Sequence, residues 1–208
     1  MMSGGGSAGE ARHLASLGAA LAIVVLIAGC TGTDTGTDTE RGSPGGIGDL
    51  PGPLPSDVSF RKPPRDALTA PDFSVALLDG TSVTASDLWD DRPLVLLFTD
   101  SSCAACANVH REVADVVNGH DGAVALLALI RENDLRGARE FAEDQQLNHP
   151  IGIGDERVWL NYAAEEPPLV VLVAPGGRVL RGWPGGADVG DLDAQLDKLY
   201  ERSPSVDE

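Results

Sequence analysis

Three uninterrupted apolar runs mark the interior of this chain. They cover residues 94–98, 123–130 and 169–173, and each is rich in leucine and valine or alanine. An alternating strand keeps one face in water, whereas an uninterrupted run is typical of a strand that is covered on both faces. The pattern therefore predicts three central strands of one sheet.

Helical periodicity fills the space between the first two runs. Val109, Val113, Val116 and Val117 recur at the spacing of one helix face, and Gly119 can end that helix. Weaker signals predict a hairpin over 70–84 that turns at Asp79-Gly80, a short helix over 86–89, a helix over 133–146, a strand over 151–153, a helix from the cap Asp155 to about 164, a strand over 178–180 and a closing helix from about 189. This order predicts an α/β fold in which helices flank a central mixed sheet, with an N-terminal β-hairpin.

The chain begins with a different signal, an isolated apolar run over 14–27. It is shorter than the roughly 20 residues of a membrane-spanning helix and fits the core of a secretory signal. The run ends in Ile27-Ala28-Gly29-Cys30, which resembles the bacterial lipobox, where the cysteine is acylated. We expect a lipoprotein signal peptide over 1–29 and a lipid on Cys30. An ordinary signal peptide followed by a chance cysteine, and an uncleaved anchor, are the alternatives.

Composition divides the remainder into three parts. Residues 30–63 are mostly Gly, Thr, Asp and Pro, which bury too little surface to offset the entropy of ordering. We therefore expect a flexible tether over 30–63, one folded domain over 64–203 and a tail over 204–208. The lipid would hold the domain outside the cytoplasm, on the cell membrane.

The charge balance is strongly acidic. Lys and Arg number 15 against 32 Asp and Glu, a net charge of −17. Such a chain has no electrostatic reason to bind nucleic acid, and the simplest consequence of the charge is solubility.

Candidate chemistry follows the first apolar run directly. Cys103-Ala104-Ala105-Cys106 begins the predicted helix, and residues three apart on a helix are neighbours, within reach of a disulfide. A helix N-terminus also favours a thiolate over a thiol. If Cys30 carries a lipid, Cys103 and Cys106 can pair only with each other. The spacing predicts thiol–disulfide exchange, with Cys103 as the nucleophile and the more buried Cys106 as the resolving cysteine.

Several segments together resemble the membrane-tethered, extracytoplasmic TlpA/ResA-like thiol–disulfide oxidoreductases of the thioredoxin-like, or redoxin, superfamily. They are 70–73 (Ala-Pro-Asp-Phe), 96–98, the Cys103–Cys106 motif, 166–173 and 176–178. The resemblance implies a thioredoxin-like fold, no cofactor, protein thiols and disulfides as partners, and a membrane thiol as electron donor. It also implies that Pro168, preceded by Pro167, is a cis proline that faces the redox pair and binds substrate. X–Pro bonds adopt the cis form far more readily than other peptide bonds.

The chain also departs from the family pattern. Ser102 stands where a Trp usually precedes the first cysteine, and Leu97 where thioredoxins bury an acid. Val109 replaces the Glu of ResA-like reductases, and Arg111 replaces a helix proline. These departures argue against a specialised role in haem maturation and leave the cysteine chemistry intact. Nearby acids, Asp100 and 165–166, would disfavour the Cys103 thiolate and so favour a strong reductant.

Three other interpretations remain. A peroxiredoxin-like thiol peroxidase shares the Ala-Pro-Asp-Phe opening, but Asp100 and Leu96 stand where its peroxide pocket requires Thr or Ser and Pro. A cell-surface binding lipoprotein with a structural disulfide is the non-enzymatic alternative, although so small a ring removes little chain entropy. We expect no metal, because zinc requires four ligands. The two cysteines and His110, expected on the helix surface, supply three, and His120 or His149 would join only if the fold brought them close.

Overall fold

The structure is a computed structural model that describes residues 44–100, 102–131 and 135–201. The expected signal peptide over 1–29, the lipidation site Cys30 and the expected tail over 204–208 lie outside these residues. No helix in the described ranges is long and apolar enough to cross a membrane.

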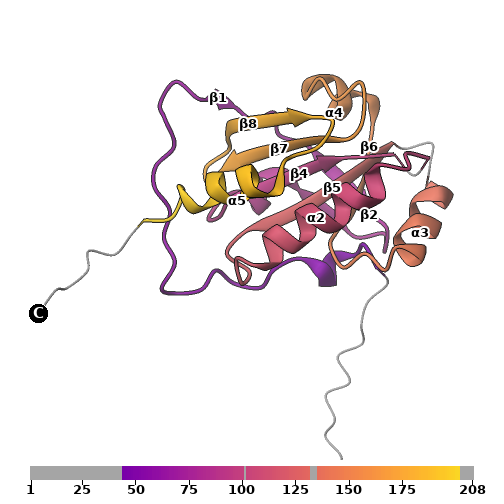
Figure 1. Ribbon diagram of the computed structural model, residues 1–208, viewed down its shortest axis with the longest axis horizontal. Coiled ribbons are helices and arrows are strands. Elements are labelled where there is room, and N and C mark those ends of the chain that lie inside the picture. Colours follow the sequence, from indigo (N-terminus) through magenta and orange to yellow (C-terminus); the bar gives the residue numbers. More distant parts are fainter. Residues whose placement is uncertain (1–43, 101, 132–134, 202–208) are drawn as a thin grey trace, which may run out of the picture. The chain divides into compact units, whose positions relative to one another are not determined.

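One eight-stranded sheet organises the domain, in the order β1-β8-β7-β4-β5-β6-β2-β3 (Figure 1). Its strands are β1 (Leu68–Thr69), β2 (Ser74–Leu77), β3 (Ser82–Thr84), β4 (Leu94–Phe98), β5 (Ala125–Arg131), β6 (Ile151–Gly154), β7 (Leu169–Ala174) and β8 (Arg178–Pro184). Strands β4, β5 and β6 are parallel, whereas β7 is antiparallel to β4. The three apolar runs thus form adjacent central strands, as the uninterrupted pattern predicts.

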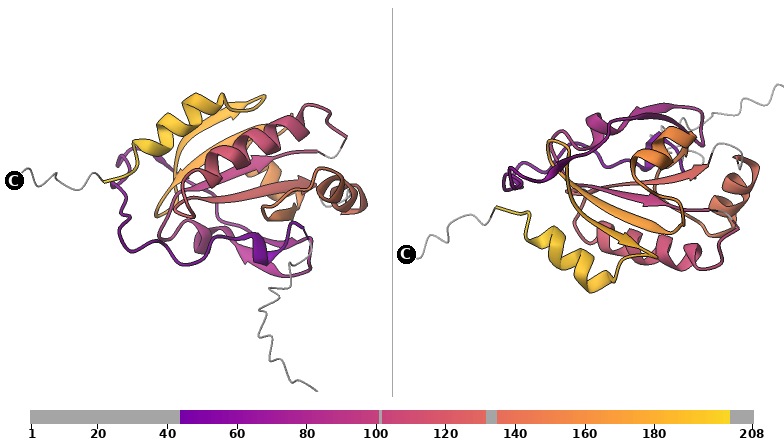
Figure 2. Two further views of the ribbon diagram at one scale, coloured as in Figure 1. Left: turned by 60° about the horizontal axis from the view of Figure 1, so that its bottom comes forward. Right: turned by 90° about the horizontal axis from the view of Figure 1, so that it is seen from above.

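Helices cover both faces of this sheet (Figure 2). The apolar cluster on one face includes side chains of α2 (Cys106–Asn118), α3 (Leu135–Asp144) and α5 (Val189–Asp197). The cluster on the other face includes α1 (Ala85–Leu88) and α4 (Glu156–Asn161). The expected α/β fold, with its mixed sheet, flanking helices and the hairpin β2–β3, is confirmed.

Several element boundaries differ from the expected ones. Strand β8 continues to Pro184, four residues past the predicted end, because it pairs with β7 along nearly its whole length. The two-residue strand β1 has no counterpart in the sequence analysis, because both its residues are exposed and only backbone pairing with β8 defines it. Helix α3 ends at Asp144, and the expected start of that helix, at 133–134, lies outside the described residues.

The described part of the expected tether, residues 44–63, packs on the domain. The amide N–H of Ile151 donates to the carbonyl of Gly45 at 3.0 Å. Gly45 has a φ of +81°, and a Cβ there would lie 2.8 Å from Leu78, so glycine permits this close approach. The N–H of Ile47, in the 3₁₀ helix η1 (Ile47–Asp49), donates to Asp79 at 2.8 Å. These backbone hydrogen bonds therefore order this part of the segment, and composition alone does not predict them.

A second contact joins this segment to the end of the domain. Phe60 forms an antiparallel bridge with Tyr200, and the two rings lie 5.1 Å apart. The N–H of Arg61 donates to the carbonyl of Leu199 at 2.7 Å. The compact part of the structure therefore extends well before residue 64, the start that composition suggested.

Candidate active site

The two cysteines lie where β4 turns into α2. A chain of backbone hydrogen bonds forms the turn: Cys103 N–H donates to the Asp100 carbonyl at 3.1 Å, and Cys106 N–H to the Cys103 carbonyl at 3.0 Å. Helix α2 begins at Cys106, so Cys103 precedes the helix by three residues instead of beginning it. The buried strand β4 fixes one end of this turn and the buried first residue of α2 fixes the other.

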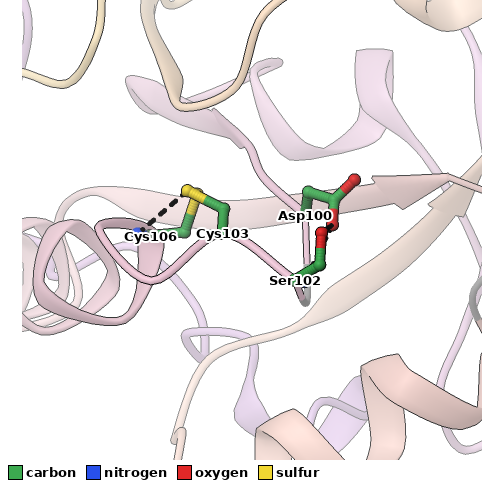
Figure 3. Close-up of a disulfide and its surroundings, with 4 residues drawn as sticks. All are labelled: Asp100, Ser102, Cys103 and Cys106. Carbon is green, nitrogen blue, oxygen red and sulfur yellow. Dashed lines mark hydrogen bonds between the residues drawn. A yellow bond between two sulfur atoms is a disulfide. The ribbon is translucent and has the colours of Figure 1, made fainter.

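Cys103 and Cys106 form a disulfide, with their Cα atoms 5.3 Å apart (Figure 3). Cys106 is completely buried, whereas Cys103 is half-buried and follows the exposed Ser102. The N–H of Cys106 lies 3.2 Å from the Cys103 sulfur and donates to it. In the reduced protein this amide, at the positive end of α2, would stabilise a Cys103 thiolate. The two sulfurs are therefore inequivalent, and Cys103 is the accessible one.

Asp100, the acidic residue nearest to Cys103 in the sequence, forms hydrogen bonds within the loop before the cysteine. Asp100 accepts hydrogen bonds from the hydroxyl of Ser102 at 2.6 Å and from its N–H at 2.8 Å. Hydrogen bonds from the Ser102 hydroxyl and N–H lower the pKa of Asp100 against the opposing effect of burial, and the charge of Arg131 lowers it slightly further. Figure 3 shows the Asp100 and Ser102 side chains facing each other, apart from the sulfurs. Asp100 thus remains charged, and its first role is to shape the loop.

Pro167 and Pro168 lie directly before β7, beside the same end of the sheet. Their peptide bond is cis, as the resemblance implies. Because Leu169 pairs with Phe98, Pro168 lies next to the end of β4, where the chain turns towards Cys103. The Pro168 carbonyl accepts a hydrogen bond from the N–H of Gly185 at 2.7 Å.

Gly186 and Val109 add a wall that sequence reasoning missed. A Cβ at Gly186 would lie 3.1 Å from Val109 on the first turn of α2 and 3.9 Å from Pro168, and Gly186 has a φ of +106°. The loop after β8 therefore lies against both the helix of the cysteines and the proline. The glycine pair after Pro184 was the only sequence signal for this approach.

His110 is buried, contrary to the expected position on the helix surface. Its Nδ1 lies 2.9 Å from Nε2 of His149, and the two rings are stacked. Desolvation, and for His110 also the neighbouring His149, lowers the pKa of His110 to about 3 and that of His149 to about 4. The pair is therefore neutral at pH 7. Within the described ranges, neither cysteine belongs to a group of three potential metal ligands, so the fold does not assemble the cysteine–histidine zinc site considered above.

The chain is similar to known proteins in sequence and in fold. Residues 66–164 match the Redoxin family, and no curated protein sequence matches the chain. The structure is similar to DsbF of Mycobacterium tuberculosis (TM-score 0.55, 22% identity, covering 62% of this chain and 98% of that one). It is also similar to a secreted M. tuberculosis disulfide oxidoreductase homologous to E. coli DsbE (TM-score 0.52, 20% identity, 60% and 94% covered).

A third similar structure is the exposed lipoprotein thioredoxin Etrx1 of Streptococcus pneumoniae (TM-score 0.54, 17% identity, 62% and 100% covered). At these identities the three structures bear on the fold, and the Redoxin match bears on the class of chemistry. Residues 66–164 are therefore a Redoxin domain, and the chain is an oxidoreductase with the thioredoxin-like fold.

Proposed function

We propose that this protein is an extracytoplasmic, membrane-anchored thiol–disulfide oxidoreductase that exchanges electrons with protein disulfides through Cys103 and Cys106. One observation carries the proposal. A disulfide joins a half-buried Cys103 to a completely buried Cys106 at the start of α2. Only the outer sulfur can meet a large client, while the inner sulfur is protected from it.

The exchange proceeds in two displacements. In the reduced protein the Cys103 thiolate attacks one sulfur of a client disulfide, forming a mixed disulfide and releasing the other client sulfur as a thiolate. Cys106, as a thiolate, then attacks the Cys103 sulfur and displaces the second client thiolate. The client gains two electrons and, after protonation, two thiols, while Cys103 and Cys106 become a disulfide. The same steps in reverse oxidise a client dithiol.

The surroundings of the pair are suited to an extended client segment. Pro168 and Gly186 lie beside the turn that carries Cys103, and Glu165 and Glu166 are exposed just before the prolines. Pro167 is half-buried and Pro168 is buried, and we propose that the backbone of this cis pair forms part of the surface that contacts the client. Electrons would come from a membrane thiol carrier.

Anchoring rests on the apolar run over 14–27 and the Ile-Ala-Gly-Cys sequence that ends at Cys30. Among the similar structures, one protein is described as a lipoprotein and another as secreted. Labelling with a fatty-acid analogue in bacteria tests the anchor: the label should enter the wild-type protein and disappear in Cys30→Ala. Equal labelling of both proteins would contradict a lipid on Cys30.

Trapping the mixed disulfide tests the exchange itself. Cys106→Ala should accumulate a covalent adduct with a model client such as insulin, because nothing resolves it, and dithiothreitol should release it. Cys103→Ala, the matched control, should form no adduct, since Cys106 is inaccessible. Adducts of equal yield on both variants would contradict the assigned roles. A peroxide-consumption assay on the same samples separates this activity from a thiol peroxidase.

A further inference from the structure

A second group of reactive side chains lies at the junction of α2 and α5. His120 follows the end of α2, while Asp193 and Asp197 are one turn apart on α5. One ligand atom from each of the three side chains lies within 4.8 Å of the other two. Two segments that are far apart in the sequence, the end of α2 and helix α5, therefore meet at one small group of ligand atoms, and neither cysteine belongs to it.

A hydrogen bond at Nδ1 orients the ring of His120 relative to the two carboxylates. Nδ1 lies 2.9 Å from the hydroxyl of Tyr200, and the two rings are stacked with centroids 5.6 Å apart. Metal-binding histidines are oriented in the same way, by a hydrogen bond from the nitrogen that does not touch the ion. Nε2 is thereby left facing the two carboxylates.

Nε2 of His120 lacks a hydrogen bond even though it is buried. The side chain is only 8% exposed, and Nε2 has no hydrogen-bond partner among the residues that the structure describes. It lies 3.2 Å from Oδ1 of Asp193. Ligands of a tetrahedral zinc ion lie about 3.3 Å apart, given bonds of roughly 2.0 Å. The spacing of the nitrogen and the oxygen is therefore that of two ligands on one ion.

The electrostatics also favour a cation at this place. Asp193 and Asp197 are like charges at helix spacing i, i+4, which destabilises a helix unless something compensates. The adjoining groove between α2 and α5 adds Glu112 and Asp115 to its lining.

We propose that His120, Asp193 and Asp197 bind a divalent transition-metal ion of the zinc type, with water completing its coordination. One nitrogen and two carboxylate oxygens suit zinc better than calcium or magnesium, which prefer oxygen ligands alone. The site uses neither cysteine and differs from the cysteine–histidine site considered in the sequence analysis. Because Tyr200 also bridges to Phe60, the ion would fasten α5, the end of α2 and the segment around Phe60 together.

Zinc titration of the full chain tests the proposal. The protein carries Cys30→Ser and no histidine tag, and it is fully oxidised so that no thiol competes. Isothermal calorimetry should show one zinc per chain. The melting temperature should rise with the zinc concentration, because the ion binds the folded state and not the unfolded one. The rise should continue even when the free zinc concentration is about 100 times Kd. Imidazole ¹⁵N spectra should show a shift at His120 and none at His110 or His149.

Three variants identify the ligands. His120→Gln and Asp197→Asn should each weaken zinc binding by at least about tenfold. Asp115→Asn, an equal change of charge in the adjoining groove, should stay within about twofold. Asp197 is exposed, so its variant decides the matter if His120→Gln fails to fold. Unchanged binding in Asp197→Asn, or no binding by the wild-type protein at millimolar zinc, would overturn the proposal and leave only the close contact between His120 and Asp193.

Discussion

The imidazole rings of His110 and His149 lie against each other inside the domain, with Nδ1 of the first 2.9 Å from Nε2 of the second. Their outer nitrogens, Nε2 of His110 and Nδ1 of His149, find no partner among the described residues. Protonation of either ring would place an uncompensated charge in an apolar interior. The pair is therefore a structural element that depends on remaining neutral.

This pair should make the domain sensitive to acid. The folded-state pKa values, about 3 and 4, lie below the ordinary value of 6.5, so the unfolded chain binds more protons at intermediate pH. The contribution of the two neutral histidines to the free energy of unfolding is fully present above pH 6.5. It is lost as the pH falls towards their pKa values in the folded protein. We expect a loss of at least about 2 kcal/mol between pH 7 and pH 4.5, measured by urea unfolding.

Other groups also titrate over this range, so the comparison requires a variant without the pair. His110→Leu/His149→Leu replaces both rings with apolar side chains of similar size, which should make the stability less dependent on pH. Identical slopes for the wild-type protein and the double variant would show that the pair does not cause the sensitivity.

The charges around the loop of Cys103 should tune its thiol in opposite directions. The negative charge of Asp100 lies in the loop before Cys103, so Asp100→Asn should favour the Cys103 thiolate, lower its pKa and raise the reduction potential. Arg131, whose charge lowers the pKa of Asp100, should act the other way, so Arg131→Gln should raise the Cys103 pKa. Alkylation rates as a function of pH measure both. Shifts of the same sign in the two variants would rule out an electrostatic cause.

Two aspartates should stabilise the helices that they begin. Asp155 accepts a hydrogen bond from Val158 N–H at 3.1 Å at the start of α4, and Asp188 accepts one from Asp191 N–H at 3.0 Å at the start of α5. Replacing either with Ala should cost about 1 kcal/mol of unfolding free energy, measured by denaturant titration. Each Asp→Asn variant, which keeps a capping oxygen, should recover most of that loss. A loss as large in Asn as in Ala would show that capping is not the cause.

The central sheet and the cysteine pair could be predicted from the sequence because their signals are local. Five consecutive apolar residues at 94–98 can be satisfied only by burial on both faces, and β4 is completely buried. The Asp79-Gly80 turn likewise predicted the hairpin β2–β3. Elements that depend on distant partners, such as β1 and its pairing with β8, left no such trace.

Helix α2 was predicted, but its buried face is wider than its valines indicate. The predicted valine face is buried at Val113 and Val117, and its other two valines pack against the core. The buried positions of α2 also include Cys106, His110 and Ala114, which the valine pattern does not contain. Those positions also follow the helical period, and they place a histidine in the core. Its partner His149 is 39 residues away, and only the fold brings the two together.

Docking of the segment before β1 provides a matched pair of variants. Gly45→Ala should disturb it, because φ is positive and the new Cβ meets Leu78. Gly48→Ala should not, since a Cβ there has nothing within 4 Å. Hydrogen exchange of the Ile47 and Ile151 amides should accelerate in Gly45→Ala only. Equal exchange in both variants would contradict the close approach at Gly45.

The most direct test of the central claim is the rate of insulin disulfide reduction by Cys103→Ala. In the proposed cycle every bond to the client is made and broken at the Cys103 sulfur, and Cys103 is half-buried and belongs to neither core cluster. The variant should therefore remain folded and lose turnover to the background rate of the reductant alone. A folded Cys103→Ala protein that reduces insulin as fast as the wild-type protein would contradict the account.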